Sequence, residues 1–101
     1  MENDAAREDL EQVRRIVLGV LAAQPARLFL FGSRARGEAG PRSDIDIAVL
    51  PQSPLVEGTL ARMREALEES TVPYRVDVVD LTEADETFRR RVLAEGVPWN
   101  D

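Results

Sequence analysis

Cysteine and histidine are both absent from this sequence of 101 residues. Without cysteine the chain has no disulfide bonds and no thiolate metal sites, and without histidine it has no imidazole general base. A catalytic metal would therefore need oxygen ligands, which favours magnesium or manganese over zinc. Lysine is absent too, so all 13 basic residues are arginine.

Long apolar runs are also missing. No stretch approaches the roughly 18 apolar residues of a membrane-spanning helix, and the first residues, MENDAAREDLEQ, are polar and acidic, unlike a signal peptide. The length is that of one domain with one small core, so we expect a single domain over residues 1–101. Together with the lack of cysteine, these features predict a cytoplasmic protein with no membrane partner.

Acidic residues outnumber basic ones, 19 to 13. The formal net charge is -6, which argues against a broad basic surface for binding nucleic acid. We therefore expect no direct nucleic-acid partner. Against this acidic background, Arg34, Arg36 and Arg42 fall close together in one loop, where they could neutralise a bound phosphate chain.

Hydrophobic periodicity and turn residues divide the chain into alternating helices and strands. Apolar residues at helical spacing predict helices over 5–23 and 55–70, and a third helix that Thr82 caps and Gly96 stops. Short apolar runs predict strands over 27–31, 44–50 and 74–81, whereas 97–101 shows no clear strand. A short connection favours antiparallel pairing of the first two strands, and the helix before the third allows a crossover. The expected fold is α+β, a small mixed sheet flanked by helices.

The most informative segment is LFLFGSRARGEAGPRSDIDIAVL. Gly32 and Ser33 follow one predicted strand, and Asp44 and Asp46 open the next. Carboxylates two residues apart on a strand project from the same face, where they repel unless a cation lies between them. Such a pair can bind the divalent ions that catalyse phosphoryl or nucleotidyl transfer. The alternative for Asp-x-Asp alone is the solvent-facing side of an ordinary half-buried strand.

A third acidic residue lies within the predicted third strand. Asp77 interrupts the apolar sequence VDVVDL, and a carboxylate is unusual in so hydrophobic a strand. If this strand lies beside the second, Asp77 completes a three-carboxylate site, binds metal and takes the proton of an acceptor hydroxyl. Asp80 is its competitor, but it faces the other side of the strand and is interpreted as an acid at a turn or helix start.

Gly32 and Ser33 form the candidate phosphate site. Glycine lets the backbone approach a phosphate closely, and serine offers both its N–H and its hydroxyl. The simpler interpretation is a turn in which Ser33 caps a short helix, and both can hold at once because the cap geometry creates the anion site. Arg34 and Arg36 are weaker candidates for contact with a triphosphate or a partner, since arginine on an exposed helix is often only solvated.

The segments FGSRARGEAGPRSDIDIAVL and VDVVDL resemble the minimal nucleotidyltransferases of the DNA polymerase β superfamily, in particular the MNT antitoxins encoded beside HEPN-domain RNase toxins. The resemblance implies a small mixed sheet flanked by helices, with ATP as donor and Mg²⁺ in a two-ion site. It implies that Gly32 and Ser33 hold the nucleotide phosphates, while Asp44, Asp46 and Asp77 bind metal. It also implies a protein partner, a cognate HEPN toxin whose tyrosine receives AMP.

Three functions are compatible with the sequence. AMP transfer to a tyrosine of the toxin is motivated by the three carboxylates. Alternatively, the chain is a non-catalytic antitoxin that blocks the toxin by direct binding. Transfer to a small molecule or a nucleic-acid end is disfavoured by the net charge of -6 and by the lack of room for an acceptor-binding domain.

Overall fold

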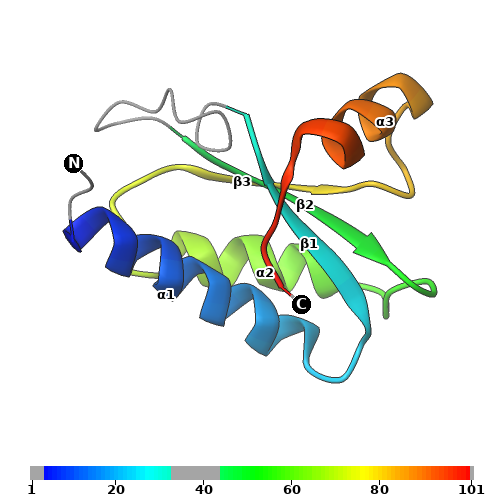
Figure 1. Cartoon of the computed structure of the whole chain (residues 1–101). Helices are drawn as coiled ribbons and strands as arrows, with labels where there is room; N and C mark the ends of the chain where they lie inside the picture. The colour runs from blue at the N-terminus through cyan, green and yellow to red at the C-terminus, as the bar shows by residue number, and fades with distance from the viewer. Residues whose placement is uncertain (1–3, 33–43, 101) are drawn as a thin grey trace.

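A computed structural model describes residues 4–32 and 44–100 of the chain (Figure 1). Its elements, in chain order, are helix α1 (Asp4–Leu21), strands β1 (Ala26–Phe31) and β2 (Ile45–Pro51), helix α2 (Thr59–Glu68), strand β3 (Val76–Asp80), helix α3 (Glu86–Glu95) and strand β4 (Val97–Pro98). Among the helices described, none is both long enough and apolar enough to cross a membrane.

The strands of the described residues form one mixed sheet in the order β3-β2-β1-β4. Strand β1 pairs antiparallel with β2, and β2 pairs parallel with β3. The parallel pair is connected through α2, because parallel neighbours need a long crossover. The predicted mixed sheet, its antiparallel first pair and its crossover are therefore confirmed.

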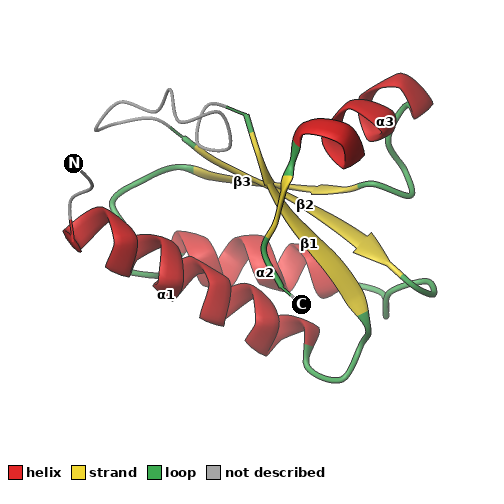
Figure 2. Ribbon diagram, in the orientation of Figure 1, coloured by secondary structure: helices red, strands yellow, loops and turns green. Residues whose placement is uncertain are grey.

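The two faces of the sheet are covered differently. Helices α1 and α2 lie together on one face, and α3 lies on the other (Figure 2). Along β2 the side chains alternate between the faces, so the fully buried Ile45 and Ile47 point toward α1 and α2, while Asp46 and Ala48 point toward the α3 side. This alternation positions the candidate site on the α3 face.

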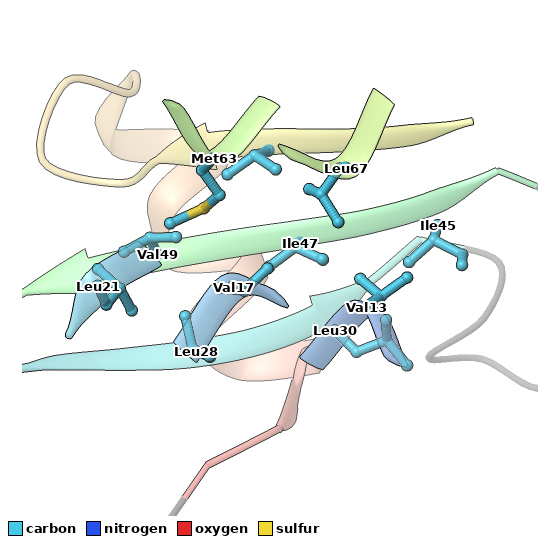
Figure 3. Close-up of a cluster of buried hydrophobic side chains, with 11 residues drawn as sticks. Val13, Val17, Leu21, Leu28, Leu30, Ile45, Ile47, Val49, Met63 and Leu67 are labelled. Atoms are coloured by element: carbon cyan, nitrogen blue, oxygen red, sulfur yellow. The ribbon is translucent and has the colours of Figure 1, made fainter. Parts of the chain in front are cut away.

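The larger core fills the space between the sheet and helices α1 and α2 (Figure 3). Val13 and Val17 of α1 are four residues apart on one helix face, as are Met63 and Leu67 of α2. Each fully buried aliphatic side chain of this kind stabilises the fold by about 1.5–3 kcal/mol. A smaller cluster lies under α3 and consists of Phe29, Ala48, Leu81 and Val92.

The bounds of several elements differ from the prediction. Helix α2 ends at Glu68 rather than 70, and strand β3 covers Val76–Asp80 rather than 74–81. Helix α1 ends at Leu21 rather than 23, because Ala22 adopts a left-handed conformation with φ of 54°. Helix α2 begins only at Thr59, since Gly58 has a φ of 85° and the Thr59 hydroxyl donates to the Val56 carbonyl at 2.6 Å. The predicted start at residue 55 was wrong because apolar residues of the preceding loop continue the helical spacing.

The predicted cap of the third helix was also wrong. Asp85, not Thr82, caps α3, and its carboxylate accepts from the backbone N–H groups of Thr87 and Phe88. The Thr82 N–H and hydroxyl donate instead to the Asp80 carboxylate, at 2.9 and 2.6 Å. Asp80 is thus an acid at a turn, as its position in the sequence predicted. Gly96 ends the helix as expected.

The C-terminal tail forms a strand that the sequence did not reveal. Val97 and Pro98 pair antiparallel with β1, and a two-residue strand is too short to show a period. The pairing is extended by Asn100, whose Oδ1 accepts from the Leu28 N–H at 2.7 Å and whose Nδ2 donates to the Ala26 carbonyl at 2.8 Å. Trp99 packs against the larger core, so the tail covers the edge of β1.

Candidate active site

The pairing of β2 with β3 brings two of the predicted carboxylates together. Asp46 is directly opposite Asp77 in the parallel register, so both side chains project from the same face of the sheet. Asp44 lies two residues before Asp46 and is exposed. The arrangement on which the interpretation of Asp77 depended, a third strand beside the second, is therefore present.

The electrostatics of Asp46 show that these acids share one environment. Burial raises the pKa of the Asp46 carboxyl above its ordinary value, and the negative charges of Asp77 and Asp44 raise this pKa further. Asp77 has a cationic neighbour, since Arg75 Nε lies 3.4 Å from its Oδ1. Among the described residues, the negative charge on this face is therefore only partly compensated.

Gly32 is packed against Asp46. It follows the β1 residue Phe31, which is paired with Asp46, and it has a φ of 75°. A Cβ atom at this position would collide with Asp46 Oδ2, so no larger residue fits without moving the carboxylate. The predicted phosphate-binding glycine and one predicted metal ligand are thus in van der Waals contact. Ser33, Arg34 and Arg36, the other predicted nucleotide-binding residues, lie outside the described residues.

An open groove of about 800 Å³ runs along β3 and includes both paired carboxylates. This volume is within the range of small-molecule sites. Beside the acids, its walls carry both charged and apolar side chains, among them Arg64 and Val79. Phe31 and Phe88 also line the groove, and their rings meet edge to face with centroids 5.6 Å apart. Sequence reasoning missed Phe88, because it comes from α3 and only the tertiary fold brings it to Asp46.

The donor set has the chemistry that a hard divalent cation requires. Carboxylate oxygens are the ligands that Mg²⁺ prefers, and a cation beside Asp46 would offset the burial and the repulsion that raise the pKa of this carboxyl. Within residues 4–32 and 44–100, however, no three acidic side chains are already gathered closely enough to hold a metal ion. The carboxylates therefore fit such an ion but would have to close around it, and the three-ligand site stays a prediction.

Comparison with known proteins shows which protein family the chain belongs to. Residues 20–98 match the family "Polymerase beta, Nucleotidyltransferase". The chain therefore belongs to the polymerase beta nucleotidyltransferase family, as its resemblance to the superfamily implied.

Individual relatives show which members of this family the chain is similar to. Over 62 residues the chain is 40% identical to a Haemophilus influenzae protein named "Probable protein adenylyltransferase MntA", a match that covers 61% of this chain and only about half, 54%, of that relative. A crystal structure of a toxin–antitoxin with AMP-PNP superposes with a TM-score of 0.71 and 29% identity, over 90% of this chain and 73% of the other. A structure described as a minimal nucleotidyltransferase has a TM-score of 0.70 and 35% identity, over 91% and 94%.

Proposed function

We propose that this chain is an antitoxin that transfers AMP from ATP to a tyrosine hydroxyl of its cognate HEPN-type RNase toxin in the cytoplasm. The observation that carries the proposal is the pairing of Asp46 with Asp77 in an open groove beside Gly32. Two similarities support it: a relative bears the name of a protein adenylyltransferase, and a structural neighbour is a toxin–antitoxin with an ATP analogue.

Each residue of the site has a role in this proposal. Asp44, Asp46 and Asp77 would hold Mg²⁺, which supplies positive charge against the charge that develops on the phosphates. Gly32 lets the backbone approach the phosphate chain, and Ser33, with Arg34 and Arg36, donates to it. The role of Gly32 also agrees with its contact to Asp46, where any side chain would collide with the carboxylate.

The transfer itself is a displacement at the α-phosphorus of ATP. The tyrosine oxygen bonds to this phosphorus, the bond to the oxygen that bridges to the β-phosphate breaks, and diphosphate leaves. Asp77 accepts the proton of the hydroxyl, since it is the carboxylate on the more accessible edge strand, with a side chain 44% exposed. The groove is open along β3, so a partner protein rather than this chain would orient the acceptor.

Intact mass spectrometry of the partner tests the proposal. The protein encoded next to this chain is incubated with the chain, ATP and Mg²⁺, and in parallel with the double variant Asp44→Asn/Asp46→Asn. We expect the partner to gain mass in multiples of one AMP with the natural chain and to keep its mass with the variant. An unchanged mass in both reactions would contradict AMP transfer.

The second candidate, a non-catalytic antitoxin, is favoured by two observations. Asp77 is already engaged by Arg75, and the described acids do not form a ready metal cluster. A cell-survival assay separates the two functions, because a blocking antitoxin needs only its binding surface. Under AMP transfer, the Asp44→Asn/Asp46→Asn variant fails to protect cells that express the toxin, whereas full protection by the variant would favour direct binding.

A further inference from the structure

A second cavity adjoins the candidate active site and is not used by the roles assigned above. It has a volume of about 210 Å³ and lies between the end of β1 and helix α3, lined by Phe31, Gly32, Phe88, Arg91 and Glu95 among others. This volume is below the roughly 300–1,000 Å³ of a complete ligand site. The cavity can therefore take only part of a ligand whose remainder lies elsewhere.

Two aromatic residues lie between this cavity and the carboxylate groove. Phe31 and Phe88 line both spaces, so they form the wall between them. Gly32 contacts Asp46 on the side of its missing Cβ and also borders the small cavity. A ligand that reached from the carboxylates past Gly32 would enter this cavity.

The α3 side of the cavity carries a cation. Phe88, Arg91, Val92 and Glu95 recur at the spacing of one helix face, and all of them line the cavity. The neighbouring Arg90 belongs to another face, where it pairs with Glu86 at 2.9 Å.

Arg91 differs from the other arginines that line the two spaces. In the groove, Arg75 pairs with Asp77, and Arg64 donates to the Val78 carbonyl at 2.8 Å. In the described part of the chain, no hydrogen bond or ion pair involves the Arg91 side chain. Its guanidinium is thus available to a ligand without breaking a contact, in a protein whose net charge of -6 otherwise repels a polyphosphate.

We infer that the small cavity is a subsite for the donor nucleotide, in which Arg91 binds the phosphate chain and the Phe88 ring packs against the nucleoside. The inference rests on the proposed function, since it presumes a nucleotide donor at Gly32. A guanidinium donates two parallel hydrogen bonds to a phosphate, and an aromatic ring gives a nucleoside an apolar contact surface. The polymerase-type motif does not include Arg91, which lies on the last helix of the chain.

Titration calorimetry of the full chain with ATP, ADP and AMP, each with Mg²⁺, tests the subsite without any toxin. We expect Arg91→Ala to bind ATP about tenfold more weakly than the natural chain, with a smaller loss for AMP, which has a single phosphate. Arg91→Lys is expected to recover part of the loss, because lysine keeps the charge but not the bidentate geometry. Arg90→Ala, on the same helix but outside the cavity, is the matched control and should bind as the natural chain does.

Three results would overturn the inference, and they are distinguishable from each other. Equal ATP affinity of Arg91→Ala and Arg90→Ala would remove Arg91 from the site and leave the proposed function intact. An equal loss for ATP and AMP would contradict a role in holding the phosphate chain. Failure of the natural chain to bind any of the nucleotides would contradict the proposed function together with its subsite. Thermal melting of each variant verifies that these exposed substitutions leave the fold unchanged.

Discussion

The two faces of the sheet perform different tasks with residues of the same strands. Toward α1 and α2, the β2 residues Ile45, Ile47 and Val49 are fully buried in the larger core (Figure 3). Toward α3 the same strand carries Asp46, which lies beside Asp77 in an open groove. The closed apolar face therefore supplies the stability that lets the chain hold mutually repelling carboxylates on the open face.

The largest expected effect comes from the closed face. Ile47→Ala removes a fully buried side chain from the centre of the larger core, and such truncations lower the free energy of unfolding by about 2–5 kcal/mol. Urea denaturation measures this loss. Because Ile47 points away from the groove, AMP transfer per folded molecule should be retained. A loss below about 1 kcal/mol would contradict the assignment of the core to this face.

The next largest effect is expected at Gly32, the glycine that contacts Asp46. Gly32→Ala forces a side chain into a φ of 75° and against Asp46 Oδ2, which we expect to cost about 1–3 kcal/mol of stability and most of the transfer activity. Gly19→Ala is the control, since nothing lies within 4 Å of its would-be Cβ on helix α1. That variant should be stabilised by about 0.5–1 kcal/mol. Equal behaviour of the two variants in thermal melting would contradict the close contact.

A smaller effect is expected at the free edge of the sheet. In β3 and its flanks, the Arg75 carbonyl and the Leu81 N–H form hydrogen bonds with β2. Because backbone groups alternate along a strand, the Val78 carbonyl points away from β2, and the Arg64 side chain donates to this carbonyl. Arg64→Ala should lower stability by about 1 kcal/mol and expose the β3 edge to self-association. Thermal melting and light scattering measure the two consequences. Arg62→Ala on the same helix serves as control, and equal scattering by both variants would contradict the covering role.

The smallest effect is a gain of stability on the acidic face. The pKa of Asp46 is raised on folding, so this carboxylate destabilises the fold progressively as pH rises from the ordinary aspartate range through the raised value. Asp46→Asn should therefore be slightly more stable at neutral pH, by about 0.5 kcal/mol or less given solvent screening. The difference should shrink as pH falls through the ordinary aspartate pKa and vanish at about pH 3 or below, where Asp46 is protonated in both the folded and the unfolded chain. Metal-free melting curves across pH that show a neutral-pH loss instead would contradict the repulsion.

Sequence reasoning succeeded where the signal is local. Strong apolar runs identified β1 and β2, and the short connection between them correctly predicted their antiparallel pairing. It failed at the start of α3, where a competing hydrogen bond determines which residue caps the helix. Asp80 takes both donors of Thr82, which moves the cap of α3 to Asp85.

The parts of the site that the sequence did not reveal come from distant segments. Phe88, and Arg91 of the proposed subsite, are remote from Gly32 along the chain, and only the packing of α3 on the sheet brings them near it. The strand β4 was missed because its partner residues in β1, rather than any pattern of its own, determine its conformation.

The most direct test of the account compares two aspartates of the same strand. Asp77 faces Asp46 in the groove, whereas Asp80 is bound to Thr82 at a turn. Transfer of AMP to the partner is measured by intact mass for Asp77→Asn and for Asp80→Asn, after melting curves have established that both are folded. We expect Asp77→Asn to abolish transfer and Asp80→Asn to retain it. Transfer that survives Asp77→Asn, or that is lost in both folded variants alike, would contradict the assignment of catalysis to the paired carboxylates.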